Sequence, residues 1–245
     1  MPETILITGA AMRIGAALAR GLAAAGHPVI LHYNASHDAA EAIASDIAHA
    51  GGRATTLGCD LTVPANHEML IRSAAKPFGP LSVLINNASQ FIPDKADNLS
   101  PATWRTHFAI HVEAPAFLAG HFAAQLPEGA GGNIINMIDE RVLRVSPQFF
   151  SYTLSKSALW TATRAMALHY APRIRVNAIG PGPSLPEKGQ TEAAFLAGQQ
   201  KLPLRHGPAL AEFAATALYI LSSPSVTGQM IALDGGRHLL GPEMV

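Results

Sequence analysis

The fold is decided at residues 5–15, which read ILITGAAMRIG. Residues 5–8 form a short apolar strand, and a turn with a glycine near each end leads into an alanine- and leucine-rich helix. Gly9 permits a tight turn, and Gly15 lets the helix begin close to the sheet. The free amides and the dipole at the start of a helix favour a bound pyrophosphate. The stretch therefore predicts a dinucleotide-binding strand–turn–helix unit, to which Ile14 also belongs.

Outward from this unit, short apolar strands alternate with helical patterns along the chain. We expect further strands at 28–32, 53–58, 81–85, 132–138, from 173 onward and at 230–233. Helices are expected at 39–50, 67–76, 101–125, 148–170, 191–200 and 208–221. Nearly continuous apolar strands between helices are typical of a parallel sheet covered on both faces. We predict an α/β fold, a single-domain Rossmann-type doubly wound parallel sheet, with the cofactor part over about residues 1–130 and the catalytic and substrate part over about 131–245.

Composition limits the classes of partner. The formal net charge is zero, and no basic stripe predicts nucleic-acid binding. No apolar run approaches the roughly 18 residues that a membrane span needs. Cys59 is the single cysteine, so no intramolecular disulfide forms, and His107 and His111 lack a clear third metal ligand. We expect a cytoplasmic protein that binds a small molecule, with no nucleic acid, membrane or metal as partner.

Two residues one helical turn apart predict acid–base chemistry. Tyr152 and Lys156 share a helix face, and the ammonium is expected to lower the phenol pKa from its usual value of about 10. Asp139 stands thirteen residues before the tyrosine, at the end of an apolar strand. An ionised carboxylate only accepts hydrogen bonds, so it suits a substrate with N–H groups or a ring nitrogen that must be protonated.

The cofactor preference is predicted from one cation and one missing acid. Arg13 lies in the glycine turn, where it can reach a 2′-phosphate or a bound acid. The end of the second strand contains Tyr33, Asn34 and Ser36, and no acid that would hold a ribose 2′-hydroxyl. Both features favour NADP(H).

In order and spacing, these motifs resemble the short-chain dehydrogenases/reductases over essentially the whole chain. The resemblance implies that Tyr152 donates a proton and that Lys156 binds the nicotinamide ribose. It also implies that His111 replaces the relay asparagine of the family, and that the tyrosine helix lines the interface of a homotetramer. The positions that would meet the cofactor elsewhere are Asp60, Leu61, Asn87, Ala88, Ser89, Pro181, Gly182 and Ser184.

Within this superfamily the chain looks like the pteridine reductases and dihydromonapterin reductases. The matching segments are TGAAMRIG at 8–15, NNASQF at 86–91, IINMID at 134–139 and LDGGRHL at 233–239. The resemblance implies NADPH-dependent reduction of a dihydropterin of the dihydromonapterin, dihydrobiopterin or dihydrofolate type. Ser89 and Phe91 would contact the pterin, with the phenyl ring stacked on it. Arg13, Asp139, Tyr152 and Leu185 complete the expected substrate set, with Leu185 in a Pro/Gly-rich lid at 180–189.

Two alternatives stay open at this point. A reductase of a carbonyl substrate, such as a 3-oxoacyl thioester or a sugar, would use Tyr152 and Lys156 but leaves Asp139 unexplained. A non-catalytic protein that senses NADPH on the same fold would not need the intact Tyr152/Lys156 pair.

Overall fold

A computed structural model describes residues 2–187 and 189–241 of the protein. Its seven strands form one parallel sheet in the order β3-β2-β1-β4-β5-β6-β7, with the reversal of strand order between β1 and β4. The strands are β1 Ile5–Ile7, β2 Val29–Tyr33, β3 Ala54–Gly58, β4 Val83–Asn86, β5 Gly132–Met137, β6 Ile174–Pro181 and β7 Met230–Leu233. The predicted doubly wound α/β fold is confirmed.

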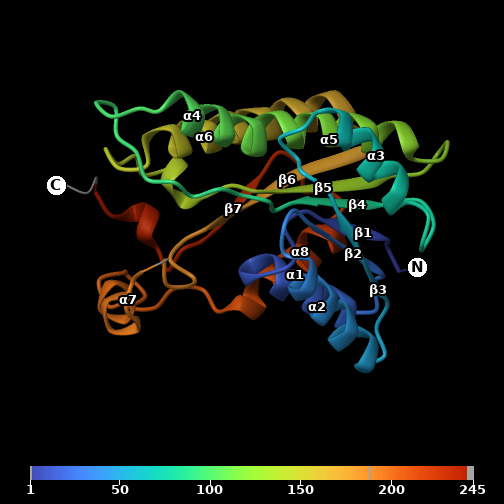
Figure 1. Ribbon diagram of the computed structural model, residues 1–245, viewed down its shortest axis with the longest axis horizontal. Helices are drawn as coiled ribbons and strands as arrows, with labels where there is room; N and C mark the ends of the chain where they lie inside the picture. Colours follow the sequence, from blue (N-terminus) through green and yellow to red (C-terminus); the bar gives the residue numbers. More distant parts are fainter. Residues whose placement is uncertain (1, 188, 242–245) are drawn as a thin grey trace.

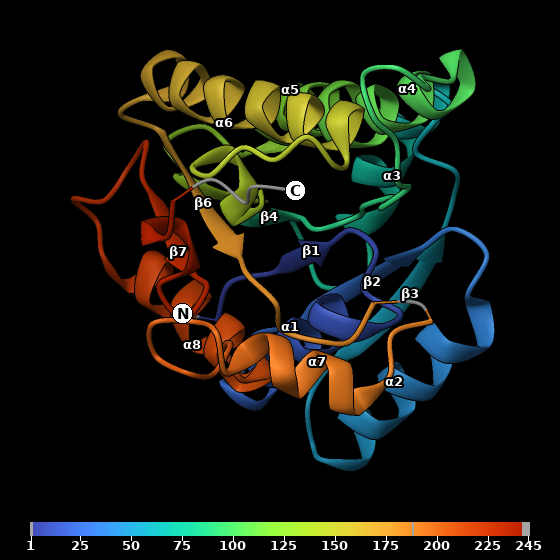
Figure 2. The same ribbon diagram turned by 90° about the vertical axis from the view of Figure 1, so that its left-hand side faces the viewer.

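Helices cover both faces of the sheet (Figures 1 and 2). One layer holds α1 Arg13–Ala24, α2 His37–His49 and α8 Leu210–Ser222, and the other holds α3 Ala65–Ala74, α4 Pro101–Phe108, α5 Ala114–Gln125 and α6 Phe150–Tyr170. Helix α7, Glu192–Gln199, follows the loop after β6. None of the helices in the described residues is long and apolar enough to span a membrane.

The strand sequences build two cores because successive side chains alternate between the faces of the sheet. Ile5 and Ile7 of β1 pack with α1, α2 and α8, whereas Leu6 packs with α3, α5 and α6. All three side chains are fully buried. Burial on both faces explains why the strands read as continuous apolar runs.

The predicted helix at 101–125 is not uniform. A π-helical turn, Ala109–Glu113, separates α4 from α5, and the amide of Ala114 donates to the carbonyl of Ala109. Pro115 lacks the amide that would bond to the carbonyl of His111 in a regular α-helix. The wider turn therefore falls on His111, one of the candidate site residues.

The close packing of α1 against α8 can be tested by a substitution at one glycine. A Cβ atom on Gly21 of α1 would lie 2.3 Å from the Cβ of Ala214 on α8. Gly21→Ala should therefore force the helices apart and destabilise the protein by about 1–3 kcal/mol, as overpacking does. Urea denaturation would measure the change.

Gly198→Ala in α7 is the matched control, because a Cβ there meets no atom within 4 Å. It should stabilise the helix by up to about 1 kcal/mol. Equal midpoints for the two variants would contradict this account of the α1–α8 packing.

Candidate functional site

The candidate site lies at the edge of the sheet where β1, β4, β5 and β6 end. Parallel pairing sets Ile7 beside Ile85, Asn86 beside Asn136, and Met137 beside Ile179. The loops that follow these strands therefore emerge side by side. In an open α/β sheet, ligands bind outside the carboxyl ends of the strands, where the strand order reverses.

Hydrogen bonds connect the glycine turn after β1 to the loop after β4. The Asn87 side-chain amide donates to the carbonyls of Thr8 and Gly9, each at 2.9 Å. Gly9 has a φ of +62°, and a Cβ on it would lie 2.8 Å from the Cα of Ala88. A Cβ on Gly15 would lie 2.3 Å from the Gly9 carbonyl oxygen. The predicted turn thus needs both glycines, and its close packing fits a dinucleotide phosphate cradle.

A buried histidine that the sequence analysis did not single out also holds this turn. His32 of β2 accepts a hydrogen bond from the Gly9 amide at Nδ1 (3.2 Å) and meets the Cys59 carbonyl at Nε2 (3.0 Å). Burial lowers the His32 pKa to about 4, so the ring is neutral near pH 7. The sequence feature that could have indicated this role is a histidine at the end of an apolar strand, in the run LHYNAS.

Arg13 occupies strained backbone at the first residue of α1. Its φ is +53°, in the left-handed region that favours glycine. The guanidinium donates to the Pro186 carbonyl at 3.1 Å, so it links the glycine turn to the loop after β6. Asn34 is exposed after β2, and Ser36 stands at the N-cap of α2. Tyr33 packs against Gly58, where a Cβ would lie 2.7 Å from the phenol ring.

The remaining cofactor-side candidates line the same edge of the sheet. Asp60 accepts the amide and hydroxyl of Thr62 at 2.8 Å each, and the carbonyl of Leu61 meets His67 at 2.9 Å. After β6, the Gly182 amide donates to the Leu233 carbonyl at 2.8 Å, and the Ser184 hydroxyl donates to the Gly182 carbonyl at 2.9 Å. Pro181 ends β6, and Leu185 is half-buried in the next loop.

The acid–base residues meet as the sequence predicts. The Tyr152 hydroxyl on α6 donates to the Asp139 carboxylate at 2.8 Å, just past the end of β5. The Lys156 ammonium donates to the Met137 carbonyl at 2.7 Å and lies 5.8 Å from the centre of the Tyr152 ring. Both α6 side chains are buried. A phenol, a carboxylate and an ammonium therefore lie together at one point on the sheet edge.

The direction of the tyrosine shift differs from the sequence-based expectation. Burial, followed by the adjacent Asp139 carboxylate, raises the Tyr152 pKa well above 10. Burial also lowers the Lys156 pKa to about 8, against the opposing attraction of Asp139. The phenol is therefore protonated at neutral pH, and acts as a donor to the carboxylate.

Ion pairs surround the carboxylate of Asp139. Its Oδ1 accepts the Arg141 amide at 2.9 Å, and the Arg141 guanidinium lies 3.9 Å away. The next residue, Glu140, is buried and pairs with Arg237 at 3.2 Å. Burial and the neighbouring Asp139 raise the Glu140 pKa to about 7. Arg141 and Arg237 were not among the predicted site residues, because charged residues after a strand are usually solvated.

The aromatic platform consists of the stacked rings of Phe91 and Phe149, beside Tyr152. Phe91 lies edge-on to Tyr152 with centroids 4.7 Å apart, and stacks on Phe149 at 4.1 Å and 12°. The Arg141 guanidinium covers Phe149 at 4.9 Å. Phe149 precedes α6 with a φ of +55°, so it lies outside the helix that was predicted at 148–170 and stacks on Phe91.

His111 links Ser89 to helix α6 through contacts of its two ring nitrogens. Its Nε2 lies 2.9 Å from the Ser89 hydroxyl, and its Nδ1 lies 2.8 Å from the Ser155 hydroxyl on α6. These two partners place His111 beside the tyrosine, and its predicted part in a proton relay stays a prediction. Within residues 2–187 and 189–241, no three His, Cys, Asp or Glu side chains gather as a metal site would require.

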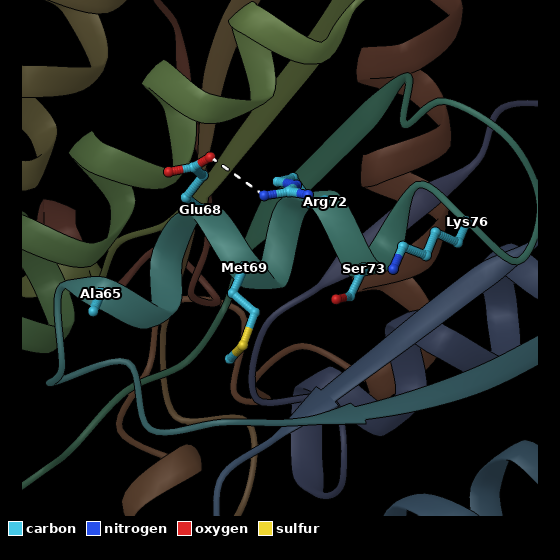
Figure 3. A pocket seen from close by; sticks show the side chains of 6 residues that line it. All are labelled: Ala65, Glu68, Met69, Arg72, Ser73 and Lys76. Carbon is cyan, nitrogen blue, oxygen red and sulfur yellow. Dashed lines mark ion pairs between the residues drawn. The ribbon is translucent and has the colours of Figure 1, made fainter.

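A surface pocket on α3 lies away from the candidate site residues. Figure 3 shows its six lining side chains, which include the ion pair of Glu68 and Arg72 at 3.9 Å. The lining residues are Ala65, Glu68, Met69, Arg72, Ser73 and Lys76. None of them is a candidate site residue, and an exposed ion pair of this kind contributes little.

Known proteins match this chain over nearly its full length. Residues 9–238 match the family described as Enoyl-(Acyl carrier protein) reductase. A dihydromonapterin reductase from Klebsiella pneumoniae is 32% identical, covering 97% of this chain and 98% of that protein. A 3beta-hydroxysteroid dehydrogenase 1 from Eggerthella lenta is 31% identical, covering 97% and 94%.

Among solved structures, the chain is similar to FolM alternative dihydrofolate reductase 1 from Brucella canis, complexed with NADP. The two chains are 48% identical with a TM-score of 0.94, and the match covers 98% of this chain and 95% of that chain.

Arg13 offers a test of cofactor preference. Arg13→Gly removes the cation and relieves the left-handed strain, so it should weaken NADPH binding about tenfold, the equivalent of one charge-assisted hydrogen bond, and leave NADH binding unchanged. Fluorescence titration with both nucleotides measures the two dissociation constants. Arg13→Lys, which keeps the charge, is the control. An equal loss for both nucleotides would show that Arg13 shapes the turn and does not read the 2′-phosphate.

Proposed function

The chain belongs to the short-chain dehydrogenase/reductase family, and on that premise we propose that it is an NADPH-dependent reductase of dihydropterins. The substrate is of the dihydromonapterin, dihydrobiopterin or dihydrofolate type, and the product is the tetrahydropterin. The observation that carries this proposal is the Asp139 carboxylate 2.8 Å from the Tyr152 hydroxyl. The likeness to the Brucella canis and Klebsiella pneumoniae reductases supports it.

The carboxylate favours a pterin over a carbonyl substrate. A carbonyl that accepts hydride develops an alkoxide, which needs hydrogen-bond donors and is repelled by an anion. Asp139 accepts a hydrogen bond from the phenol, so its negative charge lies within one hydrogen bond of the proposed proton donor. A pterin instead presents an amide-like edge and an exocyclic amine, whose N–H groups a carboxylate binds.

The platform beside Tyr152 suits a flat heterocycle. Phe91 is 38% exposed, which leaves part of the ring available for stacking on a bound ring. Ser89 lies at the end of this platform through its contact with His111. Arg13 and Leu185 would approach from the glycine turn and from the loop after β6.

The reaction adds one hydride and one proton across a C=N bond. Bound NADPH would supply the hydride to the carbon and leave as NADP⁺. The proton for the adjacent nitrogen comes from the Tyr152/Asp139 pair, in which the phenol holds the proton at neutral pH. Lys156, with its pKa lowered to about 8, keeps a positive charge at neutral pH and lies 5.8 Å from the centre of the Tyr152 ring, and in this proposal it resupplies the proton. Positioned acids of this kind contribute about 10²–10⁴-fold to the rate.

Turnover of pterins tests the proposal directly. The purified protein should oxidise NADPH in the presence of dihydromonapterin, dihydrobiopterin or dihydrofolate, as followed by the loss of absorbance of the reduced nicotinamide. A parallel panel of 3-oxoacyl thioesters and sugars should give no comparable rate. Turnover of the carbonyl panel alone, or NADPH binding with no turnover at all, would replace this proposal. The expected homotetramer and the cytoplasmic location stay predictions.

Asp139→Ser separates catalysis from cofactor binding. The substitution removes the acceptor of the Tyr152 hydrogen bond, so kcat/KM for the dihydropterin should fall by about 10²–10⁴-fold while the NADPH dissociation constant stays within about twofold. Steady-state kinetics and nucleotide titration measure the two quantities. Asp97→Ser makes the same change at an exposed residue and should alter neither. Loss of NADPH binding in Asp139→Ser would assign the carboxylate to the cofactor site.

A further inference from the structure

Two buried histidines, His107 and His111, connect α6 to the loop after β4 through hydrogen bonds of their ring nitrogens. His107 of α4 and His111 of the π-helical turn stack with ring centroids 5.5 Å apart. On one side, their Nδ1 atoms meet serines four residues apart on α6, Ser151 at 2.7 Å and Ser155 at 2.8 Å. On the other side, their Nε2 atoms meet backbone amides of the loop after β4. The two imidazoles therefore form parallel bridges between that loop and α6.

The serine partners determine where the ring protons lie. Ser155 donates its hydroxyl proton to the Tyr152 carbonyl at 2.7 Å, and Ser151 donates to the Asp94 carboxylate. A hydroxyl has one proton, so each serine must accept from a protonated Nδ1 of its histidine. Each Nε2 then carries a lone pair, which accepts from a loop amide.

The loop amides flank the proposed stacking residue. The Gln90 amide donates to His111 at 3.2 Å, and the Ile92 amide donates to His107 at 3.3 Å. Phe91 lies between these two anchored residues. Its backbone is thus held on both sides, while its ring lies edge-on to Tyr152.

Only neutral imidazoles make this arrangement, because a doubly protonated ring has no acceptor for an amide. Burial lowers the pKa of both histidines, more strongly for His111. Around His107, the Asp94 carboxylate opposes this shift and the Lys156 ammonium adds to it. Tyr152 and His111 are the other titratable rings against His107.

We propose that His107 is a positioning residue. It acts with His111 to fix the backbone on both sides of Phe91. The two histidines thereby set the position and orientation of the Phe91 ring beside Tyr152. This inference rests on the proposed function, since it assigns Phe91 to the bound ring. His107 is fully buried, and it contacts the backbone beside Phe91 through its hydrogen bond with the Ile92 amide. Asp94 strengthens the junction, because its carboxylate also accepts the Ser151 amide at the start of α6 at 3.1 Å.

Two substitutions of His107 separate its two hydrogen bonds. His107→Asn keeps a donor near the Nδ1 position and loses the acceptor of the Ile92 amide. His107→Gln keeps an acceptor near the Nε2 position and loses the donor to Ser151. With a dihydropterin, His107→Asn should raise KM about tenfold and leave kcat within about threefold, while His107→Gln stays close to the native KM. NADPH affinity should not change in either variant.

Hydrogen exchange tests the anchor without using activity. Mass spectrometry should show faster exchange in a peptide spanning residues 89–93 of His107→Asn than in the native protein or in His107→Gln. If the native protein turns over no pterin, the proposed function fails, and faster exchange in His107→Asn alone would still support the anchor. An unchanged KM and unchanged exchange in folded His107→Asn would overturn the inference, as would equal effects of both substitutions.

If His107→Asn does not fold, Ile92→Pro removes the amide donor and leaves the histidine in place. It should raise KM with little change in kcat, as predicted for His107→Asn. A native KM in Ile92→Pro would overturn the role of this anchor.

Discussion

Parallel pairing of β1, β4, β5 and β6 is the constraint from which the site follows. Since all four strands point the same way and pair in register, the residues that follow them arrive at one edge of the sheet. The glycine turn comes from β1, Asn87 and the aromatic platform from β4, Asp139 from β5, and Gly182 from β6. Each of these segments is short, so a small change in strand register would move one reacting group away from the others.

Burial controls the chemistry of the groups collected there. Tyr152 and Lys156 are buried side chains of α6, and loss of solvent favours the neutral form of each. The carboxylate of Asp139 keeps the phenol proton in place, while Arg141 and the Glu140–Arg237 pair distribute charge around it. The phenol therefore keeps its proton, which is the state that the proposed reduction would require.

Periodicity and spacing were sufficient to predict the sheet and the glycine turn, and the family resemblance implied that Asp139 and Tyr152 belong to one site. The sheet and the turn depend on residues close in sequence or on the regular geometry of parallel strands. The direction of the Tyr152 pKa could not be predicted, because spacing along a helix gives no measure of burial. The Glu140–Arg237 pair joins residues far apart in the chain. The left-handed backbone of Phe149 was also outside the prediction, which placed this residue inside the helix at 148–170. The π-helical turn at Ala109–Glu113 was outside the prediction of one continuous helix at 101–125, because the periodicity of side chains does not show where a helix widens.

The bridges through His107 and His111 differ in kind from the ion pairs on the protein surface. An exposed pair such as Arg20 and Asp46 weakens as dissolved ions screen it, over a distance of about 8–10 Å at moderate ionic strength. The contacts between each imidazole and its loop amide join uncharged groups, and both imidazoles are buried. The aromatic platform should therefore keep its geometry in concentrated salt, when the surface pairs have lost most of their attraction. Salt tolerance of ring binding is thus a property of the uncharged imidazole–amide hydrogen bonds on both sides of Phe91, separate from any response of the cofactor phosphates to ionic strength.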